Sequence, residues 1–213
     1  MPNAVFFNSY KLKKDASVPD FLHTKEKLTT EYVSKQKGWV SSAYFVDGET
    51  WADYSIWETM DDLNTFIASS RAATASGANE LAKKTYSFMN LNSGKSHRFS
   101  VERCYGFEKM HFDTSNIITF HSYKLKDGAS VSDFTLAVEK ASIEFVSQQK
   151  GWISSKLLLD GDTWADIAIF NTEDDLKAFV KLCNKNDLTS KWFSFIDFGK
   201  LRRHRFYVER SYK

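Results

Sequence analysis

Two polar side chains on predicted first strands are candidates for acid–base chemistry. Asn8 and His121 occupy equivalent positions of an internal repeat, and each is followed two residues later by a tyrosine, Tyr10 or Tyr123. Alternate residues of a strand share a face, so a histidine beside a phenol could act as acid or base near neutral pH. The alternative is a histidine with a purely structural role. Asn8 and His121 are therefore candidate catalytic residues, and Tyr10 and Tyr123 are candidate substrate-binding residues.

Two carboxylates on a second type of predicted strand form the other candidate set. Asp53 and Asp166 each follow a Trp-Ala dipeptide and alternate with bulky side chains such as Trp57. Burial among aromatic groups can raise the pKa of a carboxyl group and make it a general base. We favour the alternative that both accept hydrogen bonds from Arg, Ser or Trp groups in a sheet interface. Asp53 and Asp166 remain candidate catalytic residues, and Trp57 and Phe66 candidate substrate-binding residues.

The elements that must position these side chains occur twice in the chain. Residues 9–67 align with residues 122–180 without a gap, and the end of each copy carries a shared His-Arg-Phe segment. Such self-similarity indicates a duplicated structural unit. We expect a first repeat over residues 1–105, a linker over 106–116 and a second repeat over 117–213.

Each copy is predicted to read strand, helix, strand, strand, helix, strand. The first helix begins at a capping box, Ser17 with Asp20 in the first copy, and is expected to end at Lys37-Gly38. An Asp-Gly pair then predicts a hairpin in which both central residues have positive φ. Last strands are expected over 97–105 and 204–212. This βαββαβ order is ferredoxin-like, and bulky residues on both faces of the third strand require cover for the helix-free face. The predicted fold class is therefore α+β, with two tandem ferredoxin-like repeats packing sheet-to-sheet as an intrachain pseudo-dimeric α+β barrel.

Composition excludes several classes of function. The chain of 213 residues is 42% hydrophobic and 15% aromatic, with a net charge of +2. That charge is too small to indicate a nucleic-acid or anionic membrane partner. Cys104 and Cys183 are not equivalent in the copies, which favours a reducing compartment, and the chain start does not resemble a signal peptide. We predict a cytoplasmic protein that binds neither nucleic acid nor membrane. Without a phosphate loop, metal-ligand spacing or nucleophile elbow, we predict no cofactor and no metal.

The chain resembles the dimeric α+β barrel superfamily, within it the antibiotic-biosynthesis-monooxygenase-like group. The resemblance is carried by Gly38-Trp39-Val40, by Ile56-Trp57-Glu58-Thr59 and by the helix that follows, with counterparts in the second copy. It implies an oxygenase that uses no cofactor, with a polar residue near its pocket and an activated aromatic substrate. The haem-degrading branch would require an Asn on the first strand with Trp and His on the second helix. Asn8 matches that Asn, but Phe66 stands about where the Trp would be, and His is missing from both second helices.

Three functions follow as hypotheses, since fold alone does not give function. The first is a monooxygenase-like oxidoreductase or a binding protein for a small aromatic substrate. The second is a stress or interaction module without catalysis, which predicts that side chains fill the cavities. Haem binding or degradation is the weakest. The pseudo-dimeric chain could also form a homodimer.

Overall fold

The computed structural model describes residues 3–106 and 112–213, and its contacts divide the chain into two compact units. The first unit extends to Ser100 and includes Glu209–Lys213, and the second unit is Val101–Val208. Part of the predicted linker, residues 107–111, lies outside the described residues.

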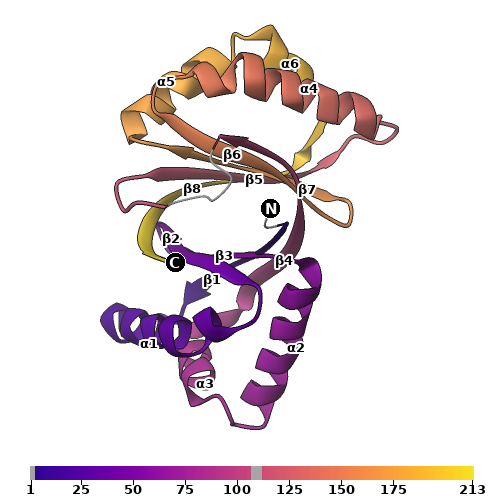
Figure 1. Ribbon diagram of the computed structural model, residues 1–213. Helices are drawn as coiled ribbons and strands as arrows, with labels where there is room; N and C mark the ends of the chain where they lie inside the picture. The colour runs from indigo at the N-terminus through magenta and orange to yellow at the C-terminus, as the bar shows by residue number, and fades with distance from the viewer. Residues whose placement is uncertain (1–2, 107–111) are drawn as a thin grey trace. The chain divides into compact units, whose positions relative to one another are not determined.

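The first unit has a four-stranded antiparallel sheet with helices on one face (Figure 1). The strands lie side by side in the order β4-β1-β3-β2, so β1 is hydrogen-bonded to β4 on one side and to β3 on the other. In this register Asn8 lies directly opposite Asp53. The elements are β1 (Ala4–Leu12), α1 (Val18–Glu31), β2 (Trp39–Asp47), β3 (Thr50–Trp57), α2 (Met60–Ala75), α3 (Glu80–Ser87) and β4 (Met89–Gly106).

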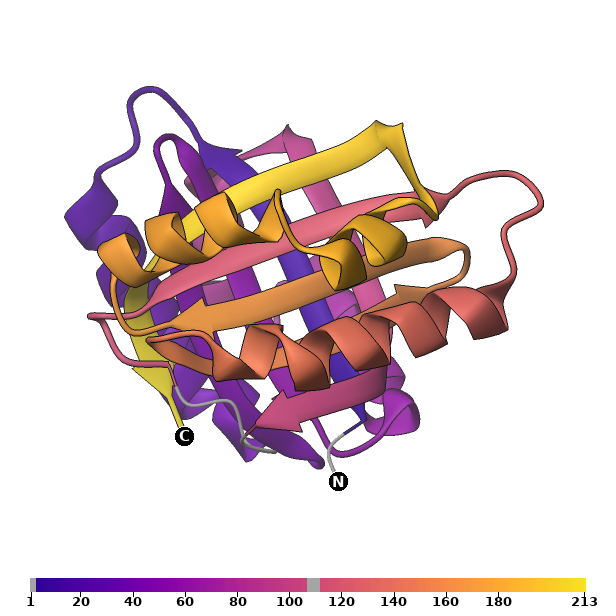
Figure 2. The ribbon, with the colours of Figure 1, turned by 90° about the horizontal axis from the view of Figure 1, so that it is seen from above.

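The second unit repeats this plan with the strand order β8-β5-β7-β6. Figure 2 shows its helices α4, α5 and α6 covering one face of its strands. His121 lies directly opposite Asp166, as Asn8 does to Asp53. The elements are β5 (Ile117–Leu125), α4 (Val131–Glu144), β6 (Trp152–Asp160), β7 (Thr163–Phe170), α5 (Glu173–Cys183), α6 (Asp187–Phe193) and β8 (Ile196–Tyr212).

The eight strands close into one hydrogen-bonded barrel, in the order β1-β3-β2-β8-β5-β7-β6-β4. The two four-stranded sets are joined where β4 neighbours β6 and where β8 neighbours β2. In each case the last residues of the long strand, β4 or β8, belong to the unit of the strand that they adjoin. The end of β4 belongs to the second unit, where a Cβ on Gly106 would lie 2.7 Å from the carbonyl oxygen of Ile153 in β6. The end of β8 belongs to the first unit, where the rings of Tyr212 and Tyr44 of β2 are 5.5 Å apart. The predicted α+β class with two tandem ferredoxin-like repeats and a closed barrel is confirmed.

Local structure differs from the prediction at the end of the first helix. Helix α1 ends at Glu31, and a short 3₁₀ turn, Val33–Lys35, precedes the loop. Gly38 then adopts a φ of +76°, and a Cβ there would lie 2.6 Å from the side chain of Asp62. Glycine is therefore required where the chain enters β2, not as the cap of α1.

The hairpin turns also differ from the prediction. Asp47 pairs with Thr50, so the two-residue loop is Gly48-Glu49. Only Gly48 has a positive φ, +57°, and among the described residues every positive φ belongs to a glycine. A glycine at the first central position is the pattern of a type II′ turn, which needs one positive φ instead of two. The last strands are also longer than predicted, because β4 and β8 begin at Met89 and Ile196.

Candidate functional site

Helix α1 places one cation on its buried face. The helix is capped by Ser17, whose hydroxyl accepts a hydrogen bond from the backbone N–H of Asp20. Phe21, Lys25 and Leu28 lie four and three residues apart, the spacing of one helical face, and all three are buried. Phe21 packs edge-on against the aromatic core of the sheet, so the side chain of Lys25 is directed toward the sheet with 7% of it exposed.

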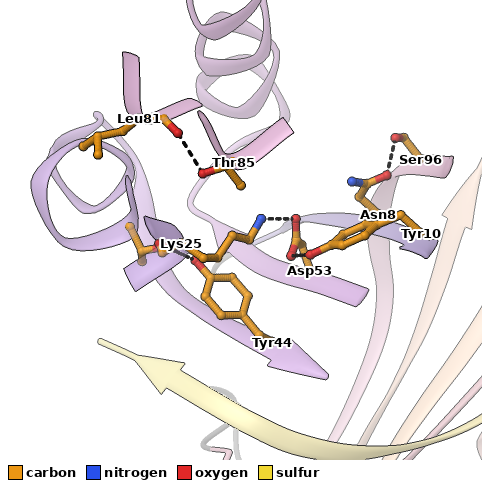
Figure 3. Close-up of polar contacts among 9 residues, drawn as sticks. Asn8, Tyr10, Lys25, Tyr44, Asp53, Leu81, Thr85 and Ser96 are labelled. Carbon is orange, nitrogen blue, oxygen red and sulfur yellow. Dashed lines mark hydrogen bonds and ion pairs between the residues drawn. The ribbon is translucent and has the colours of Figure 1, made fainter. Parts of the chain in front are cut away.

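The Lys25 ammonium forms an ion pair with Asp53 of β3. Its Nζ lies 2.6 Å from Oδ2 of Asp53, whose side chain is 16% exposed. The Tyr10 hydroxyl donates to the other carboxylate oxygen at 2.8 Å (Figure 3). The partners of Asp53 are therefore a lysine from the covering helix and a tyrosine from β1, not the Arg, Ser or Trp groups of a sheet interface that we favoured.

A second tyrosine closes the other side of Lys25. The Tyr44 hydroxyl hydrogen-bonds the Thr29 hydroxyl and donates to the backbone oxygen of Lys25 at 3.3 Å. The ammonium lies 5.0 Å from the centre of the Tyr44 ring and 5.7 Å from that of Tyr10, within the range of cation–π attraction. Burial, followed by the charge of Asp53, raises the pKa of both phenols well above its usual value, so both stay neutral donors.

These polar groups line a cavity of about 320 Å³ in the first unit. Four sequence candidates, Asn8, Tyr10, Asp53 and Phe66, line it together. The amide oxygen of Asn8 accepts a hydrogen bond from the Ser96 hydroxyl at 2.8 Å. The other side chains around the cavity are mostly aromatic, aliphatic or hydroxyl-bearing, among them Phe6, Leu28, Tyr32, Val33, Ser42, Tyr44, Ser55, Ile67, Tyr86 and Met89.

Trp57 is not among the residues that line this cavity. Its side chain is fully buried and stacks on Phe66 with ring centres 4.7 Å apart. Its indole N–H donates to the Ser55 hydroxyl at 2.9 Å. Trp57 therefore supports Phe66 from behind.

The second unit pairs its carboxylate with a histidine instead of a lysine. Nδ1 of His121 lies 2.8 Å from Oδ2 of Asp166, with 34% and 15% of the two side chains exposed. Tyr123 is buried in the core below α4, where burial and then the Asp166 charge raise the pKa of its hydroxyl well above the usual value. The structure brings His121 and Asp166 together, and their partnership follows from the cross-strand register.

Lys25 is the central residue that our sequence analysis missed. Its equivalent in the repeat is Val138, and the equivalent of Tyr44 is Leu157. The first copy has Asn8 and Lys25, and the second copy has His121 and an aliphatic residue at the equivalent positions. The aspartate therefore has a basic partner in each copy, from the helix in the first and from the neighbouring strand in the second. A lysine among the apolar positions of an amphipathic helix, replaced by valine in the other copy, was the signal that could have found it.

Comparisons with known proteins identify the fold. No family model matches the chain, and no curated protein matches it. Solved structures match over nearly its whole length at low identity. A candidate monooxygenase from Fusobacterium nucleatum has a TM-score of 0.73 at 11% identity, over 100% of this chain and 94% of its own. An anthrone oxidase-like protein has a TM-score of 0.67 at 11% identity, over 99% and 93%. The haem-degrading enzyme LmHde of Listeria monocytogenes has a TM-score of 0.55 at 13% identity, over 96% and 98%.

The chain therefore has the tandem ferredoxin-like barrel fold of the antibiotic-biosynthesis-monooxygenase-like proteins, as the sequence resemblance predicts. At these identities the likeness establishes the fold, and the functions of the matched proteins differ among themselves. None of the helices in the described parts of the chain is long and apolar enough to cross a membrane.

Proposed function

We propose that this protein is a monooxygenase-like oxidoreductase that binds a small, electron-rich aromatic substrate in the cavity of its first unit. The observation that carries the proposal is the combination of an aromatic-lined cavity of about 320 Å³ with the Asp53–Lys25–Tyr10 group on its wall. Small-molecule sites typically have this composition, with apolar walls and a few convergent polar groups.

The proposed chemistry needs a base and a dry pocket. The substrate, of the anthrone or hydroxynaphthoquinol class, would lose a proton to the Asp53 carboxylate and become electron-rich enough to react directly with O₂. A peroxide would form at the reacting methylene carbon, and loss of one water would leave a carbonyl, so that one O₂ is consumed per substrate and one oxygen atom is retained. Asn8 and Tyr10 would orient the substrate oxygen, and Phe66 would stack on its ring.

Oxygen uptake with anthrone tests the proposal. We expect uptake above the protein-free rate, with anthraquinone as product. Asp53→Asn should reduce the protein-dependent rate about 10²–10⁴-fold, the usual contribution of a general base. Glu49→Gln, which changes an exposed carboxylate of the same unit, is the matched control and should leave the rate unchanged. The proposal is rejected if wild-type protein takes up no more oxygen than buffer.

The His121–Asp166 pair of the second unit is a second candidate site, because a histidine hydrogen-bonded to a carboxylate is a familiar acid–base arrangement. Tyr123 would be its substrate-binding neighbour. His121→Ala in the same assay separates the units: a rate that falls with His121→Ala and not with Asp53→Asn assigns the chemistry to the second unit.

The two other hypotheses have less support. A module without catalysis predicts filled cavities, and the cavity beside Asn8 speaks against it. For haem, none of the described side chains that line the cavity is a histidine, which the haem-degrading branch would require. We also propose a cytoplasmic location, in keeping with two cysteines that are not equivalent in the copies, and a homodimer as the assembly to be tested by sedimentation.

A further inference from the structure

The positive and negative side chains that line the first-unit cavity do not cancel in charge. Among the described residues that line it, the charged groups are Lys25, Arg71 and Asp53, which leaves a net charge of +1. The remaining titratable groups there are tyrosines. Burial raises the pKa of Tyr10, Tyr44 and Tyr86, with the charge of Asp53 as the second cause in each case, so these phenols add no negative charge.

Lys25 has hydrogen-bonding capacity left over. An ammonium has three N–H donors, and the only hydrogen bond from Nζ within residues 3–106 and 112–213 is the one to Asp53. Its other neighbours are the rings of Tyr10 and Tyr44, which attract the charge without accepting a conventional hydrogen bond. A buried ammonium with unused donors on a cavity wall is suited to bind an anionic oxygen.

Arg71 adds charge of the same sign to the cavity lining. It lies on α2 and is exposed, and within the described chain it forms no ion pair with a carboxylate. Its charge reaches the cavity, because it acts on the hydroxyl of Tyr86, another cavity residue. A ligand with one negative charge would therefore leave the cavity neutral.

We propose that the cavity binds its aromatic ligand as an oxyanion, a phenolate or enolate, and that Lys25 is the group that holds the anionic oxygen. This inference rests on the proposed function and narrows it: the substrate class is an acidic hydroxylated aromatic or enolisable ketone. A ligand that enters as the anion brings the cavity to neutrality. Where the anion forms in place during oxygenation, the proton goes to Asp53, the total charge stays at +1, and the charge left on the substrate oxygen faces the Lys25 ammonium. The second unit has Val138 at the position equivalent to Lys25, so no ammonium occupies that place.

The test is the ionisation of a bound, coloured ligand that is already fully oxidised. Alizarin, a dihydroxyanthraquinone, changes colour when its hydroxyl ionises, so its absorbance reports the bound pKa without turnover. We expect saturable binding with the alizarin pKa lowered by about 1–3 units, the effect of an opposite charge a few ångströms away. Unsubstituted anthraquinone, which cannot form the anion, should bind at least about tenfold more weakly, corresponding to one pKa unit.

Two variants distinguish the effect of Lys25 on the alizarin pKa from the effect of the protein's overall positive charge. The double variant Lys25→Met with Asp53→Asn removes both members of the ion pair, so the cavity keeps its charge of +1 and no buried charge is left unpaired. It should bind alizarin with its pKa unchanged. Lys11→Met removes an exposed cation of the same unit, at 51% exposure, and should behave as the wild type.

Absence of alizarin binding, a bound pKa that is unchanged or raised, or equal lowering in the double variant would overturn the inference. Oxygen uptake reports separately on the proposed function. If the pKa of bound alizarin is lowered but anthrone causes no oxygen uptake, the oxyanion site is retained and the oxygenase is rejected. If anthrone causes oxygen uptake but the alizarin pKa is unshifted, the oxygenase is retained and the oxyanion site is rejected.

Discussion

Replacing Lys25 with methionine should expose how strongly the fold depends on the buried ion pair. Methionine keeps the length and apolar stem of lysine, so packing on α1 changes little and the main loss is the charge opposite Asp53. Removing one partner of a buried pair typically costs 3–5 kcal/mol, because the other charge stays buried and unpaired. Asp53 keeps its hydrogen bond from Tyr10 and is 16% exposed, so we expect the low end, a loss of about 3 kcal/mol.

Urea unfolding of the full chain measures this loss, provided that the m-value is unchanged. Adding Asp53→Asn to Lys25→Met should recover about 2 kcal/mol, because a neutral amide needs no counter-charge and still accepts from Tyr10. Lys11→Met, which breaks the exposed pair with Glu49, should leave the midpoint unchanged within error. If Lys25→Met were as mild as Lys11→Met, or the double variant no more stable than the single one, the assignment of Lys25 and Asp53 as a coupled buried pair would be wrong.

Two further predictions concern the backbone and alkaline pH. Gly38→Ala should destabilise the protein by more than Gly77→Ala in the same urea assay. The two glycines have φ values of +76° and +77°, so both substitutions incur the left-handed penalty of about 1–2 kcal/mol. Only at Gly38 does the new Cβ also meet a neighbouring side chain. Equal losses would contradict the close approach. Because folding raises the pKa of Tyr10, its proton is retained in the folded state, so its contribution is intact below the ordinary pKa and declines as pH rises above about 10. Tyr10→Phe should therefore flatten the decline of unfolding free energy above pH 10 by about 1.4 kcal/mol per pH unit, and an unchanged slope would show that Tyr10 ionises alike in both states.

The order of elements in each unit was readable from local sequence. Alternation along the strands and the capping residue Ser17 depend on neighbours a few positions apart, where backbone geometry is regular. The repeat then shows that the same order occurs twice. The predicted turn geometry was wrong at Gly48 because the loop is shifted by one residue from the Asp-Gly pair, and strand register, not the dipeptide, decides which residues form the loop.

The composition of the site was only partly readable. Asn8, Tyr10 and Asp53 could be placed on strand faces by their period of two, and all three line the cavity. Their partner could not be found in this way, because Lys25 comes from a helix 28 positions before Asp53 and which helical residue meets which strand residue depends on how α1 lies on the sheet.

The sequence by itself therefore determined that the protein contains two ferredoxin-like units and which of their strand positions are polar. Tertiary structure alone decided that Asp53 is paired with Lys25 and Asp166 with His121, and that the first pair borders a cavity. The physical reason is range: backbone periodicity acts over a few residues, whereas the environment of a buried charge is made by side chains that meet only when strands pair or when helix and sheet pack together.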